Sequence, residues 1–232
     1  MKVILITGAS KGIGKATAIM LASRGHLVIA GSRSKPTWCN GMDNIEGVVL
    51  DVRDYASVQK VIEGIITKHG RLDVLVNNAG LGYFDPLIKG QIEHWKNTID
   101  TNVTGLLNCL HIALPHLIAA KGHVVNLGSV AAHQVFKDSG VYCASKWAVL
   151  AISESIRLEL EGKVRITTIS PGAVNTEFID NTVNDELLAD FKPYFASSMH
   201  PETVAAQITF AIETPRETVI SEIIVRPSRM SE

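Results

Sequence analysis

Hydrophobic residues in this chain gather in short runs that are separated by longer segments of mixed polarity. The short runs are rich in Val, Ile and Leu and carry few polar residues, which is typical of strands buried on both faces of a parallel sheet. They predict strands at 2–7, 26–31, 47–51, 73–77, 122–128, 164–170 and 218–225.

The longer segments carry apolar residues at helical spacing. In 55–69, for example, the residues on one helical face are Val58, Val61, Ile62, Ile65 and Ile66. The same spacing predicts helices at 12–24, 55–69, 91–120, 140–161 and 201–214. Strands that alternate with helices form βαβ units, so we expect a Rossmann-type α/β fold: one domain over 1–232 with a doubly wound, seven-stranded parallel sheet, helices on both faces and ligands at the carboxyl ends of the strands.

Two connections depart from this alternation. The segment 32–46 contains Pro36, Asn40 and Gly41 and leaves little room for a helix between two strands. The segment 175–200 is long and irregular, with apolar and aromatic residues spread through it. These residues either line a pocket or dock a short helix, and the sequence favours neither.

The composition is rich in hydrophobic residues, and we expect them to be buried inside the protein. Hydrophobic residues make up 46% of the chain and the mean hydropathy is +0.19. The longest apolar stretch, 106–120, is interrupted by Asn108, His111, Pro115 and His116, so we expect no membrane-spanning helix and no membrane partner. The apolar run at 3–6 is too short for the core of a signal peptide.

Charge and cysteine content narrow the function classes further. The chain has 22 Lys and Arg against 23 Asp and Glu, a net charge of −1, which provides no field for a nucleic-acid partner. Cys39, Cys109 and Cys143 form no CxxC pair, so we expect free thiols in a cytoplasmic protein. The histidines show no HExxH pattern, and we expect no metal site.

A glycine-rich turn follows the first predicted strand and opens a helix. Glycines allow a sharp turn, and a helix N-terminus offers free N–H groups to a phosphate. A P-loop would need Gly at position 9 and Ser or Thr at 16, but both residues are Ala. The GxxxGxG spacing suits a dinucleotide better, with an ordinary strand-to-helix turn as the alternative. The candidate phosphate-binding residues are Gly8, Ser10, Lys11, Gly12, Ile13 and Gly14.

The end of the second predicted strand indicates which dinucleotide binds. An NAD-binding protein normally carries an acidic residue there, but this chain has Ser32 and Arg33. A guanidinium at 33, with Lys11 in the glycine turn, suits the 2′-phosphate of NADP(H). The alternative is that Arg33 is a solvated surface charge.

Tyr142 and Lys146 lie four residues apart in a predicted helix, so they share one face. An ammonium near a phenol favours the phenolate and lowers the pKa of the phenol, which makes the tyrosine a usable general acid and base. Ser129 follows the strand predicted at 122–128, at the sheet edge where ligands bind, and would hold a substrate oxygen. Taken alone, a Tyr and a Lys at this spacing are more often surface neighbours.

Several motifs together resemble those of the short-chain dehydrogenase/reductase family in order and spacing, from residue 2 to about residue 227. They are Thr7-Gly8 with Gly12 and Gly14, Asn77-Asn78-Ala79-Gly80, Asn102, Ser129, Tyr142 with Lys146, and Pro171-Gly172.

This resemblance implies a catalytic set of four residues. Tyr142 would donate and accept the proton, and Ser129 would orient the substrate carbonyl or alcohol. Lys146 would bind the nicotinamide ribose and lower the pKa of Tyr142, while Asn102, in the fourth helix, would anchor a water of a proton relay. The implied reaction is direct hydride transfer between NADP(H) and a carbonyl or secondary alcohol of a small-molecule substrate.

The resemblance also implies further contacts. Asp51 and Val52 would meet adenine, the stretch Asn78, Ala79 and Gly80 would line the adenosine ribose, and Pro171, Gly172, Val174 and Thr176 would stand against the nicotinamide. The segment 175–200 would then be a lid over the substrate. A homotetramer or homodimer through 91–120 and 140–161 is expected, the alternative being that these helices cover only the sheet.

Three functions fit these residues. The first is a carbonyl reductase, or an alcohol or 3-hydroxy acid dehydrogenase, since the ending 222–227 resembles family members that act on 3-hydroxy acids and small carbonyls. The second is a noncatalytic NADP(H)-binding regulator on the same fold. The third is an epimerase or dehydratase branch of the family, whose chains usually run longer.

Overall fold

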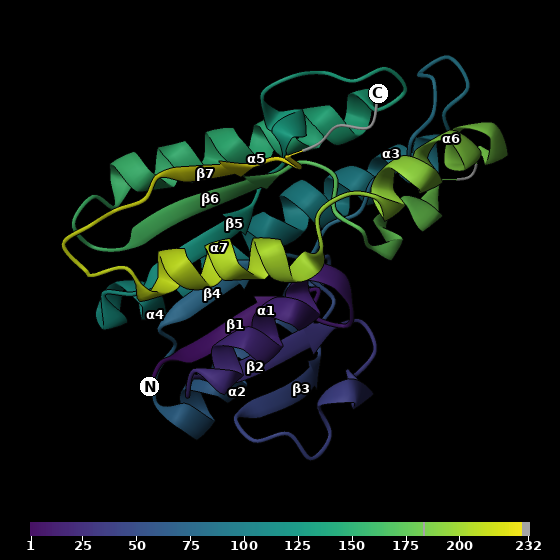
Figure 1. The fold of residues 1–232 in the computed structure, drawn as a ribbon. Coiled ribbons are helices and arrows are strands. Elements are labelled where there is room, and N and C mark those ends of the chain that lie inside the picture. The colour runs from purple at the N-terminus through teal and green to yellow at the C-terminus, as the bar shows by residue number, and fades with distance from the viewer. Residues whose placement is uncertain (183, 229–232) are drawn as a thin grey trace.

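The computed structural model describes residues 1–182 and 184–228, and its centre is a parallel sheet of seven strands (Figure 1). The spatial order is β3-β2-β1-β4-β5-β6-β7, and every neighbouring pair is parallel. The strands are β1 (Val3–Thr7), β2 (Leu27–Ser32), β3 (Ile45–Val49), β4 (Val74–Asn77), β5 (His123–Leu127), β6 (Arg165–Pro171) and β7 (Glu222–Val225). The seven predicted strands and the predicted fold class are confirmed.

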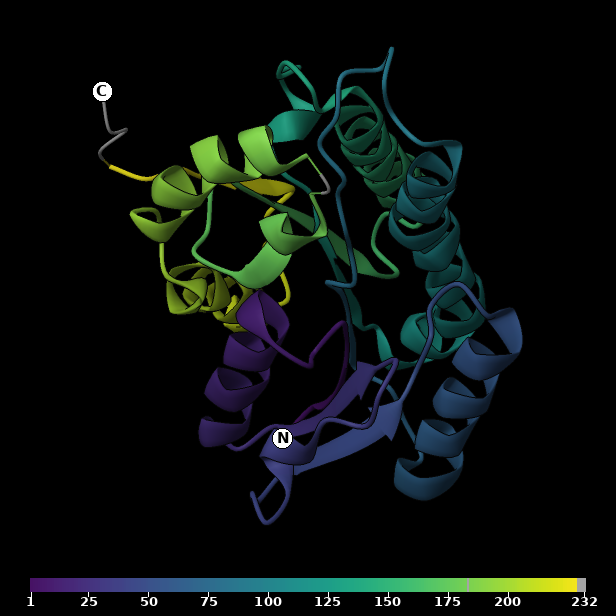
Figure 2. The same cartoon turned by 90° about the vertical axis from the view of Figure 1, so that its right-hand side faces the viewer.

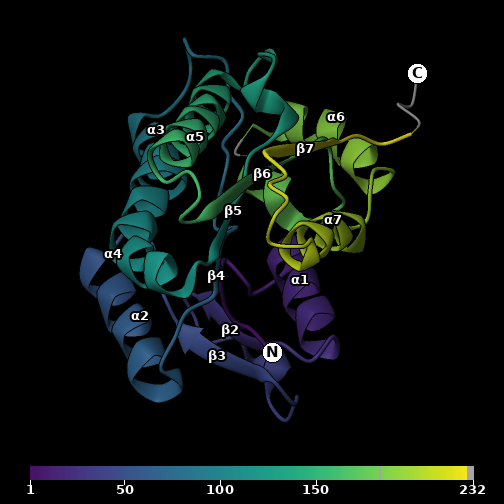
Figure 3. The ribbon, with the colours of Figure 1, turned by 90° about the vertical axis from the view of Figure 1, so that its left-hand side faces the viewer.

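Helices cover both faces of the sheet (Figure 3). One face carries α1 (Gly12–Ser23) and α7 (Pro201–Glu213), and the other carries α2 (Tyr55–His69), α4 (Gly105–Ala120) and α5 (Gly140–Glu159). Successive residues of a strand point to opposite faces, so Ile4 packs with the α1 and α7 side while Leu5 packs with the α2 and α4 side. This double burial explains the uninterrupted apolar runs in the sequence.

The chain reverses its direction of winding at the centre of the sheet. After β1 it passes through α1 to β2 on one side, and after β4 it passes to β5 on the other. In such a sheet the connections after the two central strands separate and leave a crevice at their carboxyl ends. Figure 2 views the molecule from the side on which α6 (Asp185–Ala196) lies. The helices of one face of the sheet, α1 and α7, are in the left half of the picture, and those of the other face, α2, α4 and α5, are in the right half.

The longest helical run extends from Ile92 to Ala120 and joins α3 (Ile92–Ile99), a π-helical turn (Asp100–Thr104) and α4. Within the described residues it is the one helix long and apolar enough to cross a membrane, with 33% of its most apolar window buried. This run matches the helix predicted at 91–120, and its polar residues do not break it. The sequence predicted no membrane-spanning helix, yet by length and composition this one would be long and apolar enough. Leu106, Leu110 and Leu117 nevertheless pack into the core beneath the sheet.

Both unusual connections contain short helical elements. The segment 32–46 forms a single 3₁₀ turn, Thr37–Cys39, as its length and its Pro and Gly content predict. The segment 175–200 is more regular than expected, with a 3₁₀ turn at Glu177–Asn181 followed by α6. Its residue 183 lies outside the described residues. The Asn184 side chain caps α6 by accepting hydrogen bonds from the N–H groups of Glu186 and Leu187.

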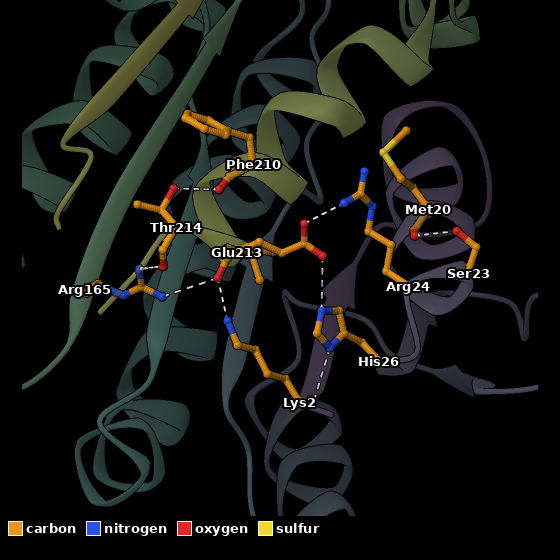
Figure 4. A network of polar contacts seen from close by, with 10 residues as sticks. Lys2, Met20, Ser23, Arg24, His26, Arg165, Phe210, Glu213 and Thr214 are labelled. Atoms are coloured by element: carbon orange, nitrogen blue, oxygen red, sulfur yellow. Dashed lines mark hydrogen bonds and ion pairs between the residues drawn. The ribbon is translucent and has the colours of Figure 1, made fainter. Parts of the chain in front are cut away.

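Charged side chains fasten the end of α7 to the sheet (Figure 4). The ammonium of Lys2 and the guanidinium of Arg165 donate to the carbonyl of Ile212 at 2.5 and 3.4 Å. Cations at a helix C-terminus satisfy its free carbonyls and its negative dipole end. Arg24 adds an ion pair to Glu213 at 2.8 Å, so α7 is tied to β1, β6 and the end of α1.

Candidate cofactor and active site

The glycine turn after β1 has a backbone that side chains would not allow. Gly8 and Gly12 have φ angles of 67° and 56°, a conformation that favours glycine. A Cβ on Gly14 would lie 2.5 Å from Nδ2 of Asn78, and one on Gly8 would lie 2.7 Å from Cα of Ala79. The glycines therefore serve both the turn and its close packing against the chain that leaves β4.

Side chains of Thr7 and Asn78 hold this packing in place. The Thr7 hydroxyl accepts hydrogen bonds from the N–H groups of Asn78 and Ala79 at 3.1 and 3.0 Å. The Asn78 amide donates to the carbonyls of Thr7 and Gly8 at 2.9 and 3.0 Å. The predicted site residue Asn78 thus uses its side chain to fix the glycine turn.

Trp38 supports the same turn from the other side, and sequence reasoning missed it. Its indole N–H donates to the carbonyl of Ala9 at 3.1 Å, and the Lys15 ammonium lies 5.5 Å from the centroid of its ring. The short segment between β2 and β3 therefore contributes an indole to the glycine turn instead of a helix. No periodic pattern in the sequence marks this contact, because Trp38 and Ala9 lie 29 residues apart.

A cavity of about 840 Å³ lies at the carboxyl ends of the central strands. It brings together the predicted Ser129, Tyr142 and Lys146 with most of the predicted cofactor residues. Those on its wall are Gly8, Ser10, Lys11, Gly12, Ile13, Ser32, Arg33, Asp51, Val52, Asn78, Ala79, Gly80, Pro171, Gly172, Val174 and Thr176. Two predicted residues, Gly14 and Asn102, do not line the cavity and instead pack behind it.

The cations of the cavity have contacts that the sequence did not predict. Lys11 forms an exposed ion pair with Glu177 at 3.2 Å, which joins the glycine turn to the turn that precedes α6. Arg33 forms no ion pair within the described residues. A second arginine, Arg53, binds Asp51 at 2.7 Å, and its hydrogen bond lowers the pKa of that carboxyl group. Arg53 was missed, although its position beside Asp51 and Val52 could have revealed it.

Tyr142 and Lys146 lie one turn apart on α5, as predicted. The ammonium of Lys146 donates to the carbonyl of Leu127 at 2.8 Å and lies 5.9 Å from the centroid of the Tyr142 ring. Burial lowers the pKa of Lys146 to about 8. Burial also raises the pKa of Tyr142 to about 12, and a hydrogen bond with Ser129 offsets only part of this rise.

The expected lowering of the Tyr142 pKa is therefore not found among the residues of the chain alone. Lys146 is buried and Tyr142 is half-buried, and the loss of hydration disfavours the phenolate and the ammonium alike. The phenol of Tyr142 consequently keeps its proton to a higher pH than an ordinary tyrosine.

Ser129 is held at the end of β5 by the backbone around it. It caps the 3₁₀ turn Val130–Ala132 and its Oγ accepts a hydrogen bond from the N–H of Ala131 at 3.1 Å. The carbonyl of Pro171 lies 3.5 Å from the same oxygen. Only 7% of Ser129 is exposed, so its hydroxyl presents a fixed polar group to the cavity.

Asn102 lies in the π-helical turn just before α4, where three hydrogen bonds hold its side chain. Its Nδ2 donates to the carbonyl of Leu81 at 2.8 Å and to the hydroxyl of Ser145 at 2.9 Å, and its Oδ1 accepts from the N–H of Leu81. Asn102 thus joins the loop after β4 to α5. The water-anchoring role stays a prediction.

Comparison with known proteins decides the family. Residues 2–187 match the family model described as short chain dehydrogenase. The chain belongs to the short-chain dehydrogenase family. The predicted resemblance is confirmed.

Relatives of this short-chain dehydrogenase align along nearly its whole length. An uncharacterized oxidoreductase of Staphylococcus saprophyticus is 38% identical, covering 99% of this chain and 97% of that protein. A serine dehydrogenase, solved in its closed form with NADP+, has a TM-score of 0.92 and 30% identity over 99% of this chain and 96% of its own. An alcohol dehydrogenase from Thermococcus sibiricus, solved with 5-hydroxy-NADP, has a TM-score of 0.86 and 27% identity over 100% of this chain and 99% of its own.

The remaining wall of the cavity in this short-chain dehydrogenase comes largely from residues that sequence reasoning did not place there. They include Ser34, Leu50, Leu81, Phe84, Thr101, Gln134, Phe136, Lys137, Phe178, Phe191, Tyr194, Phe195 and Arg226. For Phe178, Phe191, Tyr194 and Phe195, the aromatic content of 175–200 could have indicated a place on the cavity wall. Phe84 lies in an irregular loop, and nothing in the sequence indicated its place there.

Proposed function

We propose that this protein is an NADP(H)-dependent oxidoreductase that transfers a hydride between the cofactor and a carbonyl or secondary alcohol of a small substrate. One observation carries the proposal. A single cavity joins the glycine turn and Arg33 to the set of Ser129, Tyr142 and Lys146. The NADP-type ligands in the serine dehydrogenase and alcohol dehydrogenase structures support this assignment.

The residues of the cavity fit NADP(H). The turn between Gly8 and Gly12 and the N-terminus of α1 suit a pyrophosphate, since a side chain at either glycine would strain the backbone. Arg33 and Arg53 offer guanidinium groups to a 2′-phosphate. Asp51, which would repel that phosphate, is neutralised by Arg53. Lys11, engaged with Glu177, would have to leave this ion pair to reach a phosphate.

The protein's own residues position the substrate carbonyl and supply the proton. Bound NADPH supplies the hydride. The phenol of Tyr142, whose pKa burial raises, donates a proton to the carbonyl oxygen, while Ser129 donates a hydrogen bond to the same oxygen. Lys146, with its ammonium held by Leu127, provides the cation that favours the phenolate in the reverse direction.

A direct test is optical measurement of NADPH and NADH consumption by the purified protein with a panel of small carbonyl compounds, including reactive diketones. We expect turnover with NADPH to exceed that with NADH. Binding of NADPH without turnover of any carbonyl would contradict the enzymatic assignment and favour a regulatory protein.

We also propose that 175–200 acts as a lid and that the protein forms homo-oligomers. The lid proposal rests on α6, in which no described residue is fully buried, and on its position over the cavity.

Oligomer formation would cover exposed apolar residues such as Leu107 of α4 and Trp147 of α5. Slow hydrogen exchange of the α6 amides without any ligand would contradict the lid, and a monomeric mass by light scattering would contradict the oligomer.

Replacing Trp38 by Phe keeps a flat ring but removes the indole N–H that binds Ala9. The Kd for NADPH is expected to rise about two- to tenfold, because one hydrogen bond contributes roughly 0.5–1.5 kcal/mol net. Fluorescence titration with NADPH measures this change. Trp147→Phe, at a residue 49% exposed on α5, is the matched control and should leave the Kd as it is. An unchanged Kd in Trp38→Phe would show that Trp38 does not support the turn in solution.

A further inference from the structure

Aromatic side chains from separate segments meet around Tyr142. Phe84 comes from the loop after β4, Phe178 from the turn Glu177–Asn181, and Phe191 from α6. The centroid of the Phe84 ring lies 5.6 Å from that of Tyr142, 6.1 Å from that of Phe178 and 5.6 Å from that of Phe191, all in edge-to-face arrangements. We refer to Phe84, Phe178 and Phe191 as the aromatic wall.

The wall packs directly on the reactive tyrosine. The centroids of the Tyr142 and Phe178 rings are 5.4 Å apart. A Cβ at Gly82 would lie 3.0 Å from both rings, so the loop passes them with no space for a side chain. All three members of the wall line the cavity, and Phe84 is only 7% exposed. The surface beside the Tyr142 ring is therefore apolar and closely packed.

The carboxylates of the cavity offer little to a cationic substrate. The two carboxylates on its described wall, Asp51 and Glu177, are paired with Arg53 and Lys11. A substrate ammonium would lose hydrogen bonds to water beside the wall without gaining a free carboxylate. An apolar group would gain from leaving water, and a flat ring would extend the edge-to-face cluster.

We propose that the substrate bears an aryl group, or a comparably flat apolar group, next to the carbonyl, and that the aromatic wall selects it. This inference rests on the proposed function, since it names the substrate class of the same site. Phe84 is its central residue because it alone contacts the other two members and Tyr142. Lys137 and Arg226, both exposed on the cavity wall, would instead favour a carboxylate, so a 2-oxo acid is the competing class.

The wall can be tested with two diketones that differ in one group, diacetyl and acetylbenzoyl, in which a phenyl group replaces one methyl. We expect kcat/KM with NADPH to be at least about tenfold higher for acetylbenzoyl, because one extra methylene in an apolar pocket already gives about tenfold or more. Equal values for the two diketones, or higher values for pyruvate than for acetylbenzoyl, would overturn the inference while leaving the proposed function intact.

Phe191→Ala removes the one member of the wall with no ring contact to Tyr142 among those described. The preference for acetylbenzoyl should fall to about threefold or less, with kcat/KM for diacetyl changing much less. Phe210→Ala, at a residue 58% exposed on α7, is the matched control and should keep the full preference. A full preference in Phe191→Ala would show that the wall does not select the substrate.

Binding of compounds that are not reduced tests the aromatic wall independently of catalysis. Benzamide and acetamide differ by the same phenyl-for-methyl change and are not reduced, so calorimetry on the protein with NADP+ reports contact with the wall alone. We expect benzamide to bind at least about tenfold more tightly, and less so in Phe191→Ala. Equal binding would contradict the wall. Tight benzamide binding without turnover of either diketone would support the wall and contradict the proposed function.

Discussion

Replacing Tyr142 by Phe is expected to lower kcat/KM for carbonyl reduction by about 10²–10⁴-fold, the usual contribution of a positioned general acid. The variant keeps the ring that packs against Phe84 and Phe178 and loses only the hydroxyl. NADPH binding should therefore change by less than about threefold, which fluorescence titration can check. Steady-state kinetics with NADPH and a reactive diketone measure the loss.

Tyr55→Phe is the matched control, because Tyr55 is 44% exposed at the start of α2 and does not line the cavity. It should retain full activity. If the Tyr142→Phe enzyme turned over the diketone as fast as the wild type, Tyr142 would not be the proton donor.

The pH profile should follow the protonation of the same residue. The pKa of Tyr142 is raised from 10.0 to about 12, so the folded protein keeps this proton at pH values where an ordinary tyrosine loses it. Reduction uses the protonated phenol, whereas alcohol oxidation needs the phenolate. Oxidation should therefore accelerate with rising pH. An oxidation rate that fell between neutral and alkaline pH in the stable folded enzyme would contradict this assignment.

The second large effect is expected from Arg33→Asp, which should weaken NADPH binding by about 100-fold and NADH binding by less than about threefold. The guanidinium of Arg33 has no ion pair among the described residues and lines the cavity, so it is available to a 2′-phosphate. The substitution replaces attraction by repulsion near that phosphate alone. Parallel titrations with NADPH and NADH measure the two changes.

Lys163→Asp makes the same change of charge in the exposed turn before β6, outside the cavity, and serves as the control. It should alter neither affinity by more than about twofold, since exposed charges beyond a Debye length of about 8 Å are largely screened. A loss of affinity in Arg33→Asp that was equal for NADPH and NADH would exclude Arg33 from 2′-phosphate recognition.

The sequence predicted the strands more closely than the connections between them. Buried strands such as Val3–Thr7 form apolar runs that are visible in the sequence, because both of their faces must exclude water. Segment 175–200 was expected to be irregular, yet it contains α6. Its helix contains Pro193, a residue type that usually interrupts a helix, and none of its described residues is fully buried.

For the candidate site, the sequence identified the residues of each motif but not the residues with which they form hydrogen bonds and ion pairs. The sequence assigned Lys11 to a phosphate and Asn102 to a water, and both roles stay predictions. It did not reveal that Lys11 pairs with Glu177 or that Asn102 bonds to Leu81 and Ser145. Each of these partners lies far away along the chain. A spacing rule relates residues on one helix or strand, whereas such contacts depend on how separate segments pack.

The sequence by itself determined the alternation of strands and helices, the glycine turn and the pairing of Tyr142 with Lys146, because all three depend on local spacing. Tertiary structure alone placed Trp38 against the carbonyl of Ala9 and Phe84 beside Tyr142. It also decided the direction in which the pKa of Tyr142 shifts, since that pKa rises with the water removed around the phenol, and burial is a property of the packed molecule.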